Sequence, residues 1–125
     1  MAIIFDVTNG DNLMLNRGDT LSFALFINAG DELNPEQYIV TENDTVYFAL
    51  MEANGDFEHA LLKKVFTSES EKDEYGNIII TLAPEDTQNL ICGEYSYTIK
   101  LKSDTVGGKY NVFTLIPERR VDIIN

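Results

Sequence analysis

The chain has 125 residues, of which 44% are hydrophobic and 10% aromatic, a composition typical of one folded domain with its own core. Its 21 acidic residues against 9 basic ones give a formal net charge of −12, and so negative a surface repels phosphate backbones and anionic lipids. We therefore expect a single domain over residues 1–125 that binds neither nucleic acid nor membrane.

The first half of the chain shows short strand patterns separated by turn residues. Ile3–Val7 predicts a first strand, and the apolar pair Leu13 and Leu15 predicts a short second one. From Thr20 to Asn28 every second residue is apolar, which is the clearest alternation in this half and predicts one central core strand. Phe26 stands on the outer face of that strand, so it is a candidate for contact with another chain.

The middle of the chain predicts a long connection followed by a hairpin. Residues 29–44 are mostly polar and indicate a connection with a short edge strand near its end. Strand pattern resumes over Thr45–Ala53, and Asn54-Gly55-Asp56 then favours a turn. Glu58–Thr67 fits a helical turn or a strand, and we favour the strand because it would complete a hairpin. The charged run over 68–76 predicts a solvated loop.

The stretch from Ile78 to Leu101 carries the strongest pattern. Alternating aliphatic residues over Ile78–Leu82 predict a strand, and Pro84 followed by Glu85 and Asp86 predicts one helical turn. Proline suits the first helical position because its missing N–H would be unpaired there, and the helix dipole favours acidic side chains at that end. Alternation then returns over Tyr95–Leu101 and predicts another strand.

The last part of the chain predicts a hairpin and a closing strand. Gly107-Gly108 favours a turn between the strand that ends at Lys102 and a strand over Tyr110–Ile116. Pro117 should interrupt the ladder, and Arg119–Ile124 should form a separate last strand. About eight or nine short strands predict an all-β fold, an antiparallel immunoglobulin-like β-sandwich with one short helical turn.

Candidate catalytic residues are few. His59 is the only histidine and lies near no serine or cysteine in a nucleophile motif, and no glycine-rich phosphate loop is present. Cys92 is the only cysteine, so an intrachain disulfide is impossible, and we expect a small buried thiol. The carboxylates near turns lack the spacing of a calcium-binding loop. We expect no enzyme, no metal and no cofactor; a small hydrolase would require a cleft with perturbed carboxylates.

The second half contains an ordered set of features. Gly76 precedes the aliphatic strand, the segment from Pro84 to Leu90 reads Pro-Glu-Asp-Thr-x-x-Leu, Gly93-x-Tyr95-x-Tyr97-x-Ile99 follows, and Thr114-Leu115-Ile116-Pro117 precedes the closing strand. From Tyr75 on, this order resembles the amino-terminal domain of phage baseplate upper proteins and related small virion proteins of tailed phages. The resemblance implies a virion part that assembles symmetrically, links larger pieces and has no catalytic residues.

These observations together predict a non-enzymatic structural protein of a tailed-phage virion. We expect a docking or adaptor module of the baseplate, neck, capsid or fibre, which forms homo-oligomers and binds other virion proteins. The first ten residues lack a basic segment and a long apolar run, so we expect a protein made in the host cytoplasm without a signal peptide.

Candidate contact surfaces are exposed aromatic residues and strand edges. The backbone N–H and C=O groups along the outer side of an edge strand have no hydrogen-bond partner in their own sheet. We therefore expect the terminal strands Ile3–Val7 and Val121–Ile124 to pair with neighbouring subunits. The predicted contact residues are Phe26, Tyr38, Phe57, Val121 and Ile123. The alternative is a carbohydrate-binding module, which predicts that aromatic rings stand exposed together on one face, drawn from Tyr38, Tyr47, Tyr75 and Tyr110.

Overall fold

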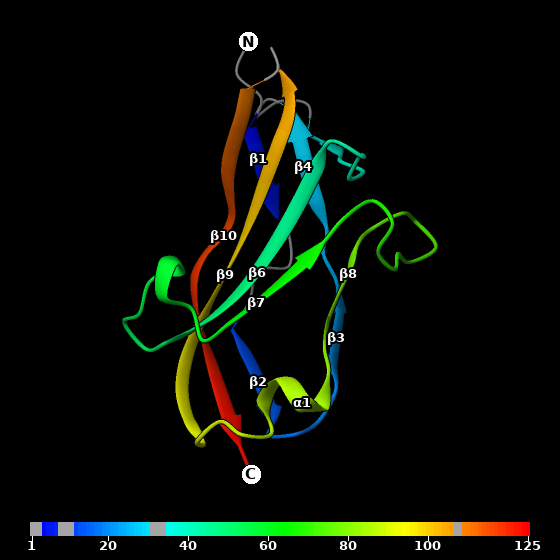
Figure 1. Ribbon diagram of the computed structural model, residues 1–125. Coiled ribbons are helices and arrows are strands. Elements are labelled where there is room, and N and C mark those ends of the chain that lie inside the picture. The colour runs from blue at the N-terminus through cyan, green and yellow to red at the C-terminus, as the bar shows by residue number, and fades with distance from the viewer. Residues whose placement is uncertain (1–3, 8–11, 31–34, 107–108) are drawn as a thin grey trace.

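The computed structural model describes residues 4–7, 12–30, 35–106 and 109–125, and these form a fold made almost entirely of strands (Figure 1). The strands are β1 (Ile4–Val7), β2 (Leu13–Asn16), β3 (Leu21–Ala24), β4 (Ile27–Gly30), β5 (Pro35–Gln37), β6 (Asp44–Glu52), β7 (Leu62–Phe66), β8 (Ile79–Leu82), β9 (Gly93–Val106) and β10 (Lys109–Ile124). The helical pieces are the 3-10 turn η1 (Phe57–His59) and the single turn α1 (Pro84–Thr87). The expected all-β, sandwich-like class is confirmed. Its immunoglobulin-like connectivity stays a prediction.

The main sheet has the strand order β2-β10-β9-β6-β7. β9 and β10 form a long antiparallel hairpin, and β6 pairs antiparallel with the other edge of β9. β7 pairs with β6 as the predicted hairpin requires, although the segment before it, Phe57–His59, is a 3-10 turn. At the opposite edge β2 runs parallel to the end of β10. This parallel pair is an exception to the expected antiparallel pairing, and the long chain between β2 and β10 provides the crossover that it needs.

The predicted strand over Thr20–Asn28 is divided between two further sheets. β3 pairs with β8, whereas β4 pairs with β1 on one side and β5 on the other. Leu25 and Ile27 are 1% and 2% exposed, so the inward alternation continues while the backbone changes sheets. Chains that turn a corner between packed sheets keep their inner face in this way. The prediction of one central strand is therefore wrong, but the prediction that Leu25 and Ile27 face the core is confirmed.

Pro117 does not end a strand as predicted. β10 continues through it, and the pairing with β9 shifts register between Thr114 and Ile116 and again between Ile116 and Arg119. A bulge accommodates a proline because the unpaired position needs no N–H donor. Thr98 Oγ1 donates a hydrogen bond to the carbonyl oxygen of Ile116 at 2.6 Å beside these shifts.

Several other predicted elements are present, with adjusted bounds. The strands near Leu13, Thr45 and Ile79 and the helical turn at Pro84 are confirmed. The edge strand of the 29–44 connection is β5, which lies earlier than expected. Ile3 and the turn at Gly107-Gly108 lie outside the described residues. In this part of the chain no helix has the length and apolar character needed to cross a membrane.

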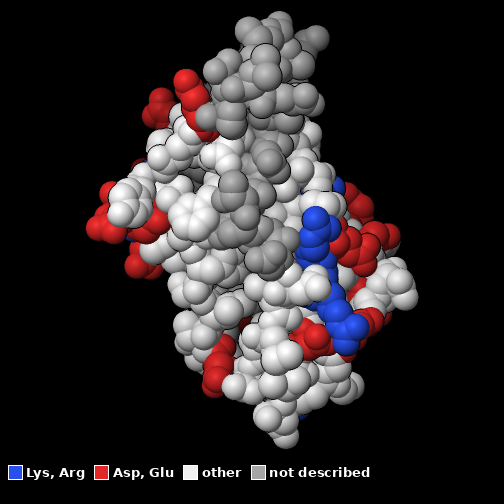
Figure 2. All heavy atoms as spheres, turned by 180° about the vertical axis from the view of Figure 1, so that it is seen from behind, with Lys and Arg blue, Asp and Glu red and all other residues white. Residues whose placement is uncertain are grey.

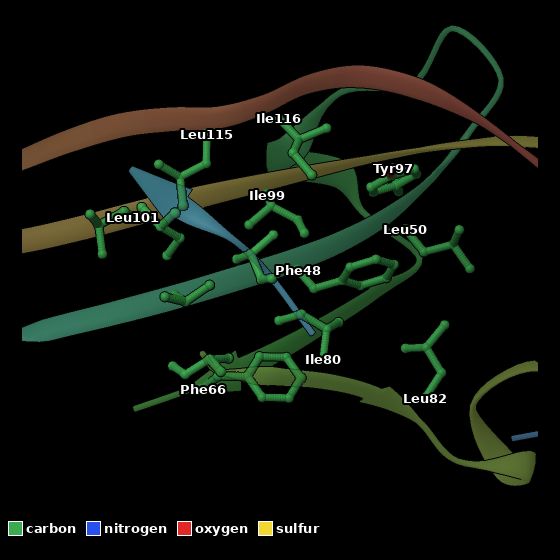
Figure 3. Close-up of a cluster of buried hydrophobic side chains, with 14 of the residues drawn as sticks. Phe48, Leu50, Phe66, Ile80, Leu82, Tyr97, Ile99, Leu101, Leu115 and Ile116 are labelled. Atoms are coloured by element: carbon green, nitrogen blue, oxygen red, sulfur yellow. The ribbon is translucent and has the colours of Figure 1, made fainter. Parts of the chain in front are cut away.

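The core lies on the inner face of the main sheet, where side chains of β6, β9 and β10 meet those of β8 (Figure 3). The rings of Phe48 and Tyr97 stack with centroids 5.5 Å apart, and both residues are fully buried. Ile80 and Leu82 of β8 are also buried in this cluster. The helical turn α1 is joined to the main sheet by an ion pair of 3.0 Å between Lys64 Nζ and Asp86 Oδ2.

Replacing Phe48 with alanine should lower the free energy of unfolding by about 3–5 kcal/mol, because it leaves a cavity beside Tyr97 that rigid neighbours cannot close. Urea denaturation measures this change. The matched control Val65→Ala, at a position 56% exposed on β7, should change stability by about 0.5 kcal/mol or less. Equal effects of the two substitutions would contradict this core.

Candidate functional site

The corner between β3 and β4 places Phe26 on the surface. Its neighbours Leu25 and Ile27 point into the core, so Phe26 points outward and is 42% exposed. Phe26 and Tyr75, which is 69% exposed, line a shallow hollow of about 320 Å³. We call this site the aromatic hollow; its lining residues are Phe26, Ile27, Asn28, Gln37, Tyr75 and Asn77.

Tyr75 is held in place by a loop built around Asp73. Asp73 Oδ1 accepts hydrogen bonds of 2.9 Å from the backbone N–H groups of Tyr75 and Asn77, and Asp73 Oδ2 accepts one from Asn77 Nδ2. Gly76 has φ of +86°, a conformation that favours glycine. Burial raises the pKa of the Asp73 carboxyl, but hydrogen bonds donated by Asn77, Tyr75 and Gly76 together outweigh it and lower that pKa. The loop is therefore more ordered than the solvated loop that its charges predicted.

β5 connects this loop to the sheet corner. Gln37 Nε2 donates hydrogen bonds to the carbonyl oxygen of Tyr75 at 2.8 Å and to Asn77 Oδ1 at 3.0 Å. Ile39, which follows two residues later, is 42% exposed, and its Cδ1 lies close to Gly76. The hollow thus combines two exposed aromatic rings with the amide groups of Gln37 and Asn77. This combination offers apolar contact and hydrogen bonding, and none of the lining residues that the structure describes is charged.

Tyr38 has a structural role in the fold. Its hydroxyl donates a short hydrogen bond to Asp44 Oδ2, and the same oxygen accepts bonds from Thr41 N at 2.8 Å and Thr41 Oγ1 at 3.1 Å. Asp44 is only 2% exposed. Burial, together with the hydrogen bond to Asp44 and the charge of that carboxyl, raises the pKa of Tyr38 to about 12. Tyr38 therefore donates to one oxygen of a buried carboxyl, Asp44 Oδ2, and it is not among the residues that line the aromatic hollow.

Phe57 lies on a different surface from Phe26. It belongs to η1, where its ring meets the edge of Tyr47 at a centroid distance of 6.4 Å. The ammonium groups of Lys63 and Lys100 lie 4.2 and 4.5 Å from its ring centroid. The structure thus separates the three predicted aromatic contact residues rather than grouping them.

The predicted contact role of Val121 and Ile123 needs correction. Both side chains are 1% exposed and belong to the hydrophobic core. Over Val121–Ile123, β10 is paired with β2 on one side and β9 on the other, so these residues offer no free edge. β1 does lie at an edge of its described sheet, as expected of the amino-terminal strand.

The tyrosines expected of a carbohydrate-binding face do not gather as predicted. Tyr75 stands beside Phe26, Tyr47 packs against Phe57, and the side chain of Tyr110 lies outside the described part. The pair of Phe26 and Tyr75 was missed because the two residues are far apart in the sequence. The sequence does contain one local indication of the position of Tyr75. Asp73 followed by Gly76 and Asn77 is a spacing that favours a tight turn, and such a turn would fix the backbone of Tyr75.

Chemically reactive residues are dispersed over the surface. His59 Nδ1 lies 2.7 Å from Asp56 Oδ1 on an exposed turn, and hydrogen bonds from His59 lower the pKa of Asp56. Cys92 is exposed, so the expected buried thiol is wrong; it lies next to Ile91, which is 80% exposed, in the connection that leads to β9. Over the described ranges, no group of three or more His, Cys, Asp or Glu residues is placed to hold a metal ion.

No model of a known protein family matches this sequence, and the search of curated proteins also finds no match.

Replacing Tyr38 with phenylalanine should destabilise the isolated chain by about 1–2 kcal/mol at neutral pH, because the buried Asp44 carboxyl loses a donor. The folded pKa of Tyr38, about 12, lies above the ordinary tyrosine value of about 10. The contribution is thus complete below the ordinary value and is lost as pH rises towards the folded value. Denaturation at several pH values should show the two proteins converging in alkali. A residue that only contacts a partner would leave monomer stability unchanged.

Proposed function

We propose that this chain is a non-enzymatic structural protein of a tailed-phage virion, a docking or adaptor module of the baseplate, neck, capsid or fibre. In this proposal it binds other virion proteins, forms homo-oligomers and is made in the host cytoplasm. The resemblance from Tyr75 onward supports the virion context. The aromatic hollow supports docking as the mode of action.

The observation that carries the proposal is the exposure of two aromatic rings on a well-ordered backbone. Phe26 is held by the sheet corner, and Tyr75 by the hydrogen bonds around Asp73. Aromatic side chains are enriched at protein interfaces, where they bury a large area with few rotatable bonds. Because the backbone at both residues is already positioned, less backbone conformational entropy is lost on binding. Ile39 adds a further exposed aliphatic side chain near them.

The charge distribution favours the same surface. A formal charge of −12 makes two copies of this chain, or this chain and another acidic protein, repel each other. Figure 2 shows acidic side chains spread over much of one face, with a band of Lys and Arg beside some of them. Among the described residues, none that lines the aromatic hollow carries a charged side chain. Acidic partners can therefore meet there with the least repulsion between neighbouring groups.

A carbohydrate-binding module is the second candidate, and the composition of the same hollow favours it. Sugar rings stack on aromatic side chains through their C–H faces, while their hydroxyls bond to amide groups. Phe26 and Tyr75 provide the rings, and Gln37 and Asn77 provide the amides. In this alternative the module would help the particle adhere to a host surface.

Replacing both Phe26 and Tyr75 with serine should reduce incorporation of the chain into phage particles by about tenfold or more, since the loss of two buried anchors removes several kcal/mol of contact energy. Particles would be purified from a host that supplies the variant in place of the original gene, and the chain would be quantified by mass spectrometry. Circular dichroism would establish that the variant is folded.

The matched control is Met14→Ser with Ile91→Ser, which removes two side chains that are 67% and 80% exposed elsewhere. This control should enter particles at the level of the original chain. Absence of the original chain from purified particles would contradict the virion proposal. Normal incorporation of the Phe26 and Tyr75 variant would contradict the role of the aromatic hollow.

Glycan-array binding separates the second candidate from the first. If the hollow docks proteins, no glycan on the array should lose its binding when Tyr75 is replaced with alanine. A glycan that depends on Tyr75 and on Phe26, but not on Ile91, would favour the carbohydrate-binding module instead.

A further inference from the structure

A second hollow lies on the outer face of the main sheet, beside η1. Residues Val46, Phe48 and Leu50 of β6 are buried, so the alternate residue Tyr47 points to the opposite face. The strand register places Tyr47 opposite Lys100 of β9 and Ala49 opposite Lys63 of β7. The side chains of Tyr47, Lys63 and Lys100 lie with Phe57 around a space of about 380 Å³. We call it the lysine hollow; its lining residues are Tyr47, Phe57, Glu58, Lys63, Lys100, Lys102 and Val112.

The ring of Phe57 holds two positive charges close together. Lys63 Nζ lies 4.2 Å and Lys100 Nζ 4.5 Å from the ring centroid. Such contacts contribute about 0.5–1 kcal/mol each at exposed sites, while two like charges near one ring repel each other. Neither lysine forms an ion pair with a carboxylate of the described residues. An anion in the hollow would relieve this repulsion while the ring keeps both ammonium groups in position.

The residues that line the lysine hollow indicate both the charge and the apolar character of a ligand that would fit it. Three of the chain's 9 basic residues line it against a single acidic one, Glu58, although the whole chain is strongly acidic. Val112, which is 62% exposed, and the rings of Tyr47 and Phe57 add apolar surface beside the ammonium groups. A ligand that fits this lining carries a carboxylate next to aliphatic carbon, as a glutamate or aspartate side chain does.

We propose that the lysine hollow binds a short acidic segment of a partner polypeptide. Nucleic acids and anionic membranes present many charges, which the surrounding acidic surface repels. A short segment places one or two carboxylates within reach of the lysines, and salt screens the more distant repulsion beyond about 8–10 Å. This surface is distinct from the aromatic hollow, so the inference holds whether or not the docking role of Phe26 and Tyr75 is correct.

Titration of a Ser-Gly-Glu-Glu-Gly-Ser peptide, acetylated and amidated at its ends so that it carries only two carboxylates, into the isotope-labelled chain tests the proposal when amide NMR shifts are followed. Saturable shifts should concentrate at residues of β6, η1, β7 and β9 that line the lysine hollow. The affinity should fall about tenfold in the double variant Lys63→Gln with Lys100→Gln, and also as NaCl rises from about 50 mM to about 300 mM.

The matched control is Lys72→Gln with Arg119→Gln, which removes two positive charges that do not line the hollow. It should lower the affinity less than twofold. An equal loss of peptide affinity in both double variants would mean that binding depends only on the net charge of the chain, and would overturn the proposal. Absence of peptide binding would overturn it too, as would inorganic phosphate that binds the same residues as tightly as the peptide. The aromatic-hollow variant should bind the peptide normally, which separates this test from that of the docking role.

Discussion

The structure depends on the burial of the inner faces of β6 and β9 against β8. These two strands lie in the middle of the main sheet, and their inward residues, such as Phe48, Leu50, Tyr97 and Ile99, are fully buried. Removing this apolar surface from water is the main favourable contribution to folding, at about 25 cal/mol per Å². The stacked rings of Phe48 and Tyr97 join the two strands at the centre of the core. The corner, the helical turn and the outer strands are arranged around this contact.

The same burial determines which side chains remain outside. In a strand, consecutive side chains point to opposite faces, so fixing Phe48 in the core places Tyr47 on the outer face beside Lys100. At the corner, burial of Leu25 and Ile27 leaves Phe26 exposed. Two surfaces of opposite chemistry result, one uncharged and aromatic, the other cationic. In the proposed docking role, each of these surfaces would expose a partner to less repulsion than the acidic remainder of the chain does.

Strands and the helical turn were predicted well from the sequence where neighbouring residues alone determine them. Alternation located β6, β8 and β9, and Pro84 with two following acidic residues located α1. Alternation does not say which strand will be the neighbour, so neither the change of sheet at Leu25 and Phe26 nor the parallel pairing of β2 could be predicted from it. Pro117 was read as a break because sequence does not show that the partner strand can absorb a bulge.

The functional residues were harder to predict than the strands, since their roles depend on neighbours distant in sequence. Phe26 was chosen for its outward position, and it is exposed as expected. Tyr38 of the 29–44 connection is also a predicted contact residue, but its hydroxyl donates a hydrogen bond to the buried Asp44. Val121 and Ile123 were assigned to a free edge that β2 in fact covers. The partnership of Phe26 with Tyr75 required the folded corner and the ordered loop at Asp73, which periodicity alone does not reveal.

If this chain acts by assembling with proteins, its own copies included, then light scattering of the purified chain should detect the self-association. The purified chain would be measured from about 1 µM to about 1 mM, because a contact between copies makes the mass depend on concentration. We expect an oligomer of defined stoichiometry at the upper end, which dissociates on dilution. A monomer at every concentration would contradict self-assembly.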